Sequence, residues 1–120
     1  MSKAIFITLF LFSLAVPGHA QEWAIRADDQ PLDNDLVRAE IVGKSLQYFD
    51  GGVSKFSAGG AYSYTYLGGG TSFGSFEIAD DGTVCIAFRN GWSRCDRYAL
   101  SGDRLVLLTE DGERFPVENY

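Results

Sequence analysis

The chain has 120 residues, 46% of them hydrophobic, and a formal net charge of −6 from 16 acidic and 10 basic side chains. Nucleic acids and anionic membrane surfaces repel a protein of this charge, so we expect neither as a partner. A chain of this length forms one domain with a core of modest size.

Residues 1–20 have the pattern of a secretory signal peptide. Lys3 precedes a largely apolar run over residues 4–16, and a Pro-Gly pair and small residues follow that run. The run is shorter than the roughly 20 apolar residues that a membrane-spanning helix needs. We therefore predict cleavage after Ala20, a periplasmic or secreted location, and no transmembrane segment in the product.

Cleavage would also remove His19, the only histidine, and would leave nine basic against 16 acidic side chains. Without an imidazole, Ser–His and Cys–His catalysis and histidine-ligated metals are excluded. The paired carboxylates lie in turn-like segments, and a small domain offers little room for the cleft of a glycosidase. We expect a protein that is not an enzyme and that holds no cofactor and no metal.

The rest of the chain divides into an arm and a domain. Residues 21–32 read as an N-terminal arm, polar and turn-rich toward its end, with Trp23 packed against the domain. Residues 33–120 read as a single β domain that begins with a short helix. Asp33 is suited to cap that helix and Gly43 to end it, and the helical spacing is carried by Leu36, Val37, Glu40 and Ile41.

Glycines divide the chain after residue 43 into short runs of β-forming residues. The eight runs are KSLQYFD, VSKFSA, AYSYTYL, SFGSFEIA, TVCIAF, WSRCDRYAL, RLVLLT and ERFPVE. Runs spaced by about 8 to 12 residues are typical of all-β proteins. The pattern predicts an antiparallel meander of about eight strands, strongly curled or closed into a small barrel.

Three turns share one form, two polar residues followed by glycine, at residues 80–82, 89–91 and 110–112. This form is typical of a three-residue hairpin loop whose last residue is left-handed. With such a loop at 89–91, Cys85 lies opposite Cys95, close enough to form a disulfide. A two-residue loop would leave the sulfurs diagonal, so we prefer the longer loop and a structural Cys85–Cys95 bond.

The same counting assigns the faces of the strands. It predicts a core face that contains Phe76, Ile78, Val84, Ile86, Phe88 and Trp92. The two cysteines lie on the opposite face, together with Ala87 and Ser93.

Two groups of residues are candidate binding sites. The first is Tyr62, Tyr64 and Tyr66, which alternate along one strand and so project from one face. They form either an aromatic wall for a flat or sugar-like ligand or part of a filled interior. We favour the filled interior, because eight short strands enclose little more space than their own side chains occupy.

The second group surrounds Cys95 and comprises Trp92, Arg94, Asp96 and Tyr98. Strict alternation turns Arg94 and Asp96 toward the core, where a charge is costly unless it is paired. Either a bulge rotates the strand, or the two residues form a polar pair near the rim of the barrel. We favour the pair.

The segments IVGKSLQYF, AGGAYSYTY, FEIADDGTVCIAF and NGWSRCDRY resemble small exported proteins of unknown function found in alphaproteobacteria. The resemblance extends over residues 41–117. It implies an exported β domain and supplies no activity and no site residues.

Together these observations favour an exported binding or accessory module of the cell envelope, whose partner is an unknown protein or envelope component. The alternative is a lipocalin-like carrier that binds a small ligand along Tyr62, Tyr64 and Tyr66. A carboxylate hydrolase and a protease inhibitor are weaker readings, because the sequence reveals neither a catalytic constellation nor a reactive loop.

Overall fold

The computed structural model describes residues 23–120, so the predicted signal peptide lies outside the described residues. No helix in this range is long and apolar enough to cross a membrane. The described elements are one helix, α1 (Asn34–Ile41), and the strands β1 (Asp29–Pro31), β2 (Lys44–Tyr48), β3 (Val53–Phe56), β4 (Ala61–Thr65), β5 (Thr71–Ile78), β6 (Val84–Phe88), β7 (Ser93–Ser101), β8 (Arg104–Thr109) and β9 (Arg114–Asn119).

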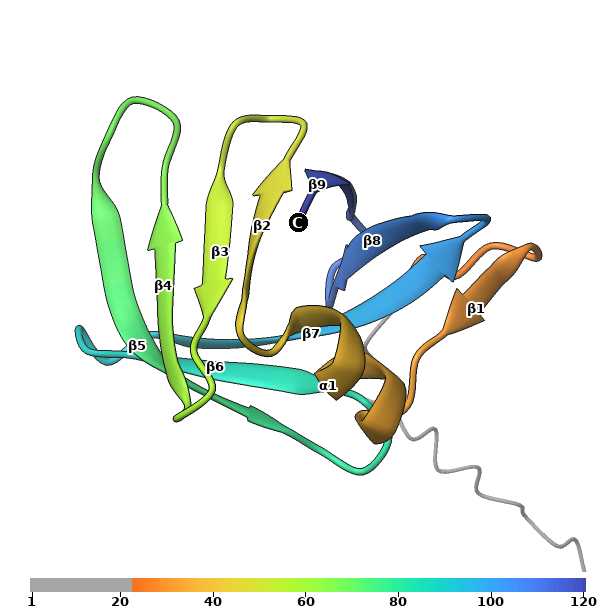
Figure 1. Ribbon diagram of the computed structural model, residues 1–120, viewed down its shortest axis with the longest axis horizontal. Coiled ribbons are helices and arrows are strands. Elements are labelled where there is room, and N and C mark those ends of the chain that lie inside the picture. Colours follow the sequence, from red (N-terminus) through yellow and green to blue (C-terminus); the bar gives the residue numbers. More distant parts are fainter. Residues whose placement is uncertain (1–22) are drawn as a thin grey trace, which may run out of the picture.

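Strands β2 to β9 close into an eight-stranded antiparallel barrel (Figure 1). Each strand pairs with its neighbour in sequence, and the pairing of β2 with β9 completes the circle. The eight strands expected from the glycine-punctuated runs are all present, and the choice between a curled sheet and a barrel is settled in favour of the barrel. Because the barrel is closed, each of these eight strands has a hydrogen-bonded neighbour on both sides over at least part of its length.

Six of the hairpins use the same three-residue loop. In each, the residue before the loop accepts a hydrogen bond from the last loop residue and donates one to the residue after it. The last loop residue is always a glycine with φ between 91° and 110°, a conformation that is costly for other residues. The hairpin between β7 and β8 is tighter, with only Gly102 and Asp103 between the paired residues.

Because consecutive strands run in opposite directions, consecutive hairpins lie at opposite ends of the barrel. Four loops gather at one end, which we call the rim: residues 49–51, 67–69, 89–91 and 110–112. Helix α1 lies at the other end, as Figure 1 shows. The barrel is therefore covered at one end and open at the rim.

Helix α1 covers its end of the barrel with two fully buried side chains, Val37 and Ile41. Asp33 caps the helix by accepting a hydrogen bond from the backbone N–H of Leu36, as its position predicts. The Asn34 amide donates to the carbonyl oxygens of residues 78 and 79 at the end of β5, which anchors the helix to the barrel.

The interior of the barrel is filled. The ring of Phe56 lies 5.0 Å from the rings of both Tyr62 and Phe76. The buried tyrosine hydroxyls are paired: the Ser54 hydroxyl lies 3.0 Å from that of Tyr48 and 2.9 Å from that of Tyr62. Buried polar groups that bond to one another avoid the cost of desolvation, so this network fixes the packing of the aromatic core.

The register of the β6–β7 hairpin confirms the predicted disulfide. Cys85 pairs directly with Cys95 across the two strands, their Cα atoms are 4.0 Å apart, and the sulfurs are bonded. The bond lies on the outer face of the barrel. On the inner face, Val84 and Ile86 are buried as expected, whereas Trp92 is not.

The N-terminal arm is more ordered than its composition predicts. Residues 29–31 form β1, which pairs with β7 beyond the end of β6, and Leu32 enters the core. The sequence does not predict this strand, because its residues are polar and its formation depends on pairing with the backbone of β7. Trp23 packs on the outer face against Ala99, Val106 and Leu108, in agreement with the expectation that it lies against the domain.

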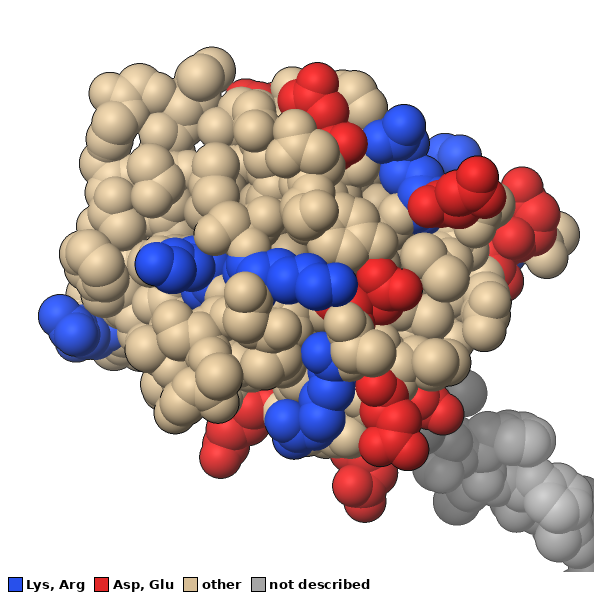
Figure 2. Space-filling view, viewed as in Figure 1, with Lys and Arg blue, Asp and Glu red and all other residues tan. Residues whose placement is uncertain are grey.

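Charged side chains are distributed unevenly. No charged residue lies between Lys55 and Glu77, a stretch that contains all of β4 and most of β5. On the face shown in Figure 2, the β4–β5 hairpin at the upper left bears no charged side chain, whereas acidic groups gather on the right and along the lower edge. The rim therefore has one uncharged side.

Candidate functional site at the rim of the barrel

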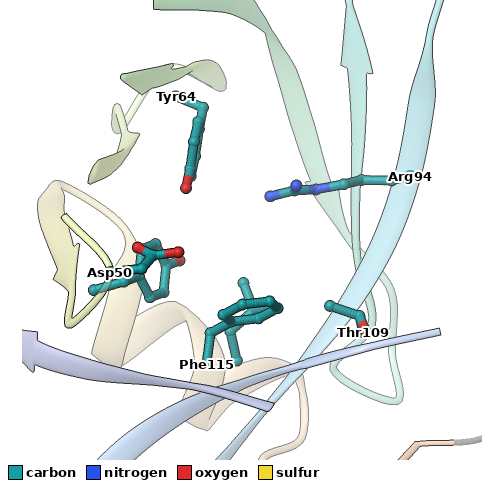
Figure 3. A pocket seen from close by; sticks show the side chains of 7 residues that line it. Asp50, Tyr64, Arg94, Thr109 and Phe115 are labelled. Atoms are coloured by element: carbon teal, nitrogen blue, oxygen red, sulfur yellow. The ribbon is translucent and has the colours of Figure 1, made fainter. Parts of the chain in front are cut away.

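A cavity of about 100 Å³ opens at the rim, and we call it the mouth cavity. Five strands or their loops contribute its lining, which consists of Tyr48, Asp50, Tyr64, Arg94, Leu107, Thr109 and Phe115. Figure 3 shows the side chains of Asp50, Tyr64 and Arg94 directed toward a common space. A carboxylate, a phenol and a guanidinium thus converge above an apolar floor.

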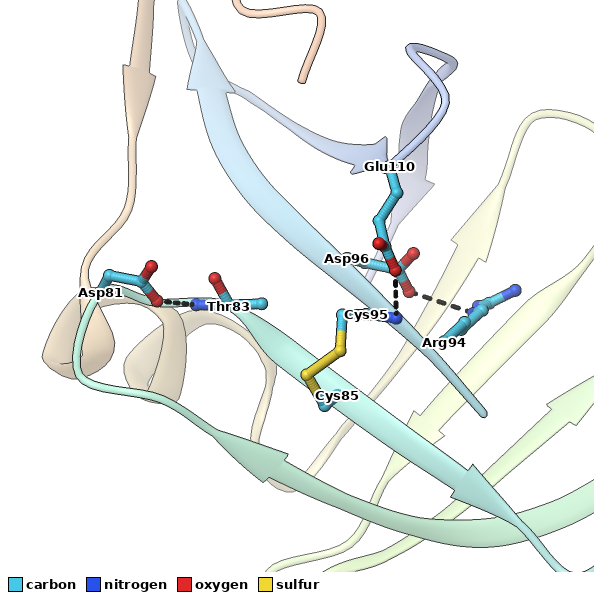
Figure 4. The surroundings of a disulfide bond; sticks show 7 residues. All are labelled: Asp81, Thr83, Cys85, Arg94, Cys95, Asp96 and Glu110. Atoms are coloured by element: carbon cyan, nitrogen blue, oxygen red, sulfur yellow. Dashed lines mark hydrogen bonds and ion pairs between the residues drawn. A yellow bond between two sulfur atoms is a disulfide. The ribbon is translucent and has the colours of Figure 1, made fainter. Parts of the chain in front are cut away.

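Arg94 connects this cavity to the buried interior. Its Nε lies 3.1 Å from Oδ2 of Asp96 (Figure 4). Its Nη2 donates a hydrogen bond of 3.3 Å to the Tyr62 hydroxyl. The Arg94 side chain is 40% exposed, whereas that of Asp96 is only 2% exposed. The β6–β7 register continues without a bulge, so the favoured reading, a polar pair near the rim, agrees with the structure.

The environment of Asp96 disfavours its charge. Burial raises the pKa of this carboxyl to about 6, although the positive charge of Arg94 opposes the rise and the charge of Glu110 adds to it. The contact between Nε and Oδ2 is electrostatic, since within the described part of the chain neither atom has a partner with hydrogen-bond geometry. Arg94 is therefore held in position by charge, by the Tyr62 hydroxyl and by the Tyr64 ring, whose centroid lies 5.7 Å from the guanidinium carbon.

The opposite wall of the mouth cavity is built around Gly52. A Cβ at this position would lie 2.0 Å from the Tyr64 hydroxyl oxygen, so only glycine leaves room for the ring. The Gly52 N–H donates to Oδ1 of Asp50 at 2.9 Å, which holds that carboxylate beside the phenol. Burial and the charge of Asp50 both raise the pKa of Tyr64, so its hydroxyl keeps its proton.

A second hollow, the rim groove, adjoins the mouth cavity and has a volume of about 330 Å³. It runs between the β4–β5 and β6–β7 hairpins and is lined by Tyr66, Ser72, Phe88, Asn90, Trp92, Ser93 and Arg94. Arg94 lines both hollows. The ring of Tyr64, in the mouth cavity, meets the ring of Tyr66, in the rim groove, edge to face with 4.8 Å between the ring centroids. The two hollows thus form one continuous site.

The predicted tyrosine strand runs from core to solvent. Tyr62 is buried, Tyr64 is half-buried in the mouth cavity, and Tyr66 is 53% exposed beside the rim groove. The filled-interior reading therefore holds for Tyr62, whereas Tyr64 and Tyr66 line hollows at the rim, because the strand passes from the filled interior to the open rim.

The second predicted group is divided in the same way. Asp96 and Tyr98 are buried and have no surface for a partner, while Arg94 lines both hollows. The prediction that Trp92 faces the core is wrong, since the residue is 71% exposed. Alternation gives the inward direction, but Trp92 follows a rim loop, where no opposite wall covers it.

Five other residues that line the mouth cavity escaped the sequence analysis as site residues: Tyr48, Asp50, Leu107, Thr109 and Phe115. All lie in, or within three residues of, the rim loops at 49–51 and 110–112, in segments that read simply as turns and strand ends. One signal was available. In a meander, alternate hairpins share an end, so counting hairpins brings the loops at 49–51 and 110–112 to the end that holds Arg94.

Comparison with protein-family models, curated proteins and solved structures finds no match to this chain. Residues 23–120 contain no cluster of three or more His, Cys, Asp or Glu side chains that could hold a metal ion.

Proposed function

We propose that this protein is an exported, non-enzymatic binding module that contacts its partner through the rim of the barrel. The observation that carries the proposal is the contrast between a filled interior and exposed aromatic side chains at the rim, Tyr66 and Trp92 above all. Large exposed apolar side chains on a folded domain are costly in solubility, and their grouping marks an interaction site.

The dimensions of the mouth cavity favour this function over that of a carrier. Sites that enclose a drug-sized ligand have volumes of about 300–1,000 Å³, whereas the mouth cavity has about 100 Å³, and the larger rim groove of about 330 Å³ lies between exposed side chains at the surface. The residue types at the rim point the same way, because tryptophan, tyrosine and arginine are the side chains that most often dominate binding energy. A partner therefore binds across the rim and inserts only a small group into the barrel.

Export is supported by the signal-like N-terminal segment, by the disulfide and by the resemblance to exported β-domain proteins. The cell envelope or the surrounding medium is then where the partner is found.

Site-specific photocross-linking in the producing cells tests the proposal. A benzophenone amino acid is placed at Trp92 in one variant and at Leu36 in the control. Leu36 is also an exposed apolar residue, but it lies on α1 at the opposite end of the barrel. We expect a discrete adduct from position 92 and none from position 36.

Equal labelling at both positions, or labelling at position 36 alone, would contradict a rim site. Native mass spectrometry of protein purified without refolding provides the second arm. We expect an oxidised chain without a passenger, and a small molecule retained in the barrel would favour the carrier instead.

A further inference from the structure

We infer that the rim groove and the mouth cavity form a binding site for a neutral carbohydrate, an inference that rests on the rim being the binding surface. The two hollows share Arg94 and differ in character. The rim groove offers aromatic rings, and the mouth cavity offers a small set of polar groups. A sugar ring has the matching division, with apolar C–H faces and hydroxyl groups around its edge.

The aromatic walls match the face of a sugar ring. Trp92 and Tyr66 are 71% and 53% exposed and line the same groove, with Phe88 between the core and the rim. Aromatic side chains combine a large apolar face with a polar edge, so they bind amphipathic ligands without losing their own hydrogen bonds.

The polar groups match a pair of neighbouring hydroxyls. A carboxylate only accepts hydrogen bonds, a guanidinium only donates them, and a phenol does both. Asp50, Arg94 and Tyr64 present these three groups to the mouth cavity (Figure 3). A hydroxyl pair donates to the carboxylate and accepts from the guanidinium, whereas a ligand carboxylate or phosphate leaves Asp50 facing a like charge.

Electrostatics favours a neutral ligand for two further reasons. The charge of Arg94 is opposed by Asp96 at 3.1 Å and by Asp50 in the same cavity. The β4–β5 hairpin, which forms the other side of the groove, has no charged residue, because none lies between Lys55 and Glu77. Within the mouth cavity an ammonium group meets Arg94 as a like charge and an anion meets Asp50 as a like charge, whereas a neutral ligand meets neither repulsion.

The closed barrel disfavours one common mode of peptide binding. An extended peptide often binds by adding a strand to a free sheet edge. At the rim groove, β4 is paired with β3 and β5, and β6 is paired with β5 and β7. The backbone groups of β4 and β6 that would recognise a peptide strand are therefore occupied, and β7 lacks a partner on its β8 side only over residues 93–95, a stretch too short to pair with an extended peptide strand.

An array of neutral, amino-substituted, uronic-acid and sulfated oligosaccharides, including fragments prepared from bacterial envelopes, tests the inference. Each neutral glycan that binds is then titrated against a Trp23→Phe variant, which leaves Trp92 as the one tryptophan, while the tryptophan fluorescence is followed. We expect binding of neutral glycans and a blue shift of the emission, because stacking on a sugar ring excludes water from the indole.

Three variants assign the binding to this site. Trp92→Ala is expected to weaken binding at least about tenfold, by loss of the stacked ring. Tyr64→Phe keeps the ring and removes one hydroxyl, so a loss of about three- to tenfold is expected. Phe49→Ala is the matched control, since Phe49 is an exposed rim aromatic that lines neither hollow. Its affinity is expected to equal that of the wild type.

The carbohydrate inference is overturned if no glycan binds, if only charged glycans bind, or if Trp92→Ala binds as tightly as the wild type. The photocross-linking experiment separates this failure from failure of the rim site itself. A protein adduct from position 92 together with an empty array would leave the rim as the binding surface and reject carbohydrate as its ligand.

Discussion

Arg94 and Asp96 stand two residues apart on β7, and their side chains meet inside the barrel with Nε 3.1 Å from Oδ2. One member of the pair is buried and the other reaches the rim. The carboxylate therefore bears the cost of burial, while the guanidinium remains available to a ligand. Any change in the charge of Asp96 is felt at the site, because its Oδ2 lies only 3.1 Å from the guanidinium Nε of Arg94.

The pair makes folding stability depend on pH. Burial raises the pKa of Asp96 to about 6 from a value of 3.8, so between these values the folded protein holds a proton that the unfolded chain releases. The free energy of unfolding contributed by this group therefore falls as pH rises from about 4 to about 6. Urea unfolding of the wild type and of Asp96→Asn across this range measures the effect.

The variant is expected to lack this part of the pH dependence because its side chain does not ionise, so its stability relative to that of the wild type rises as pH increases from about 4 to about 6. A carboxyl titration of Asp96 followed by NMR with a midpoint near 4 would contradict the prediction.

Two glycines with the same backbone conformation are expected to differ in how well they tolerate substitution. Gly82 and Gly91 end equivalent loops with φ of 92° and 95°. A Cβ at Gly82 would lie 2.0 Å from the carbonyl oxygen of Leu32, whereas nothing lies within 4 Å of a Cβ at Gly91. Substitution by alanine costs about 1–2 kcal/mol at either position for the left-handed backbone.

In Gly82→Ala the new Cβ must in addition displace the segment that leads into α1. We expect the variant's loss of unfolding free energy to exceed that of Gly91→Ala by about 2 kcal/mol or more, a size typical of forced packing changes. Chemical denaturation of the two variants gives the difference directly. Equal losses would mean that the segment around Leu32 moves without cost.

What the sequence predicted correctly was local in origin. The loop form at residues 89–91 sets the register of its own hairpin, and the register alone brings Cys85 opposite Cys95. The helix cap at Asp33 depends in the same way on residues within one turn. Loop geometry and capping need no knowledge of distant parts of the chain, so a pattern in the sequence is sufficient for them.

What the sequence did not predict depends on closure of the barrel. Strand β1 exists because β7 extends beyond β6 and offers backbone groups to residues 29–31. Trp92 is exposed because the inner face at a rim loop has no opposite wall. Asp50 and Arg94 line the same cavity only because closure of the barrel brings the ends of β2 and β7 to one rim. Such relations join residues far apart in the chain, and no local pattern encodes them.

The disulfide is expected to support the fold without shaping the site. Cys85 and Cys95 are separated by ten residues and lie on the outer face, and neither lines the mouth cavity or the rim groove. Closing so short a loop stabilises by at most about 3 kcal/mol, and by less here because the hairpin is already local. The Cys85→Ser, Cys95→Ser double variant is expected to lose about 1–2 kcal/mol in urea unfolding.

The same variant is expected to keep the wild-type affinity at the rim. Reduction of the wild type under native conditions is the control for the serine side chains. A double variant that no longer folds would show that the bond does more than restrict one hairpin.

The ion pair between Arg114 and Asp29 forms a clamp on the outer face. We expect its effect on the pH dependence of folding stability to be opposite in sign to that of Asp96. Arg114 donates to both carboxylate oxygens of Asp29, at 2.6 and 3.1 Å, and Nη1 also donates to the carbonyl oxygen of Ala24 at 2.7 Å. These hydrogen bonds from Arg114 lower the pKa of Asp29 to about 2, against the opposing effect of burial.

Because the folded pKa of Asp29 is depressed, its stabilisation is present above about pH 4 and is lost as pH falls toward 2. Arg114→Met is therefore expected to cost about 2 kcal/mol at pH 6, the size of hydrogen bonds to a charged group, and less at pH 2.5. Arg38→Met is the control, since Arg38 is an exposed arginine that bonds to the amide of Asn34, which does not titrate. If the cost of Arg114→Met were the same at both pH values, the N-terminal arm would be held by Trp23 and the β1 pairing rather than by the clamp.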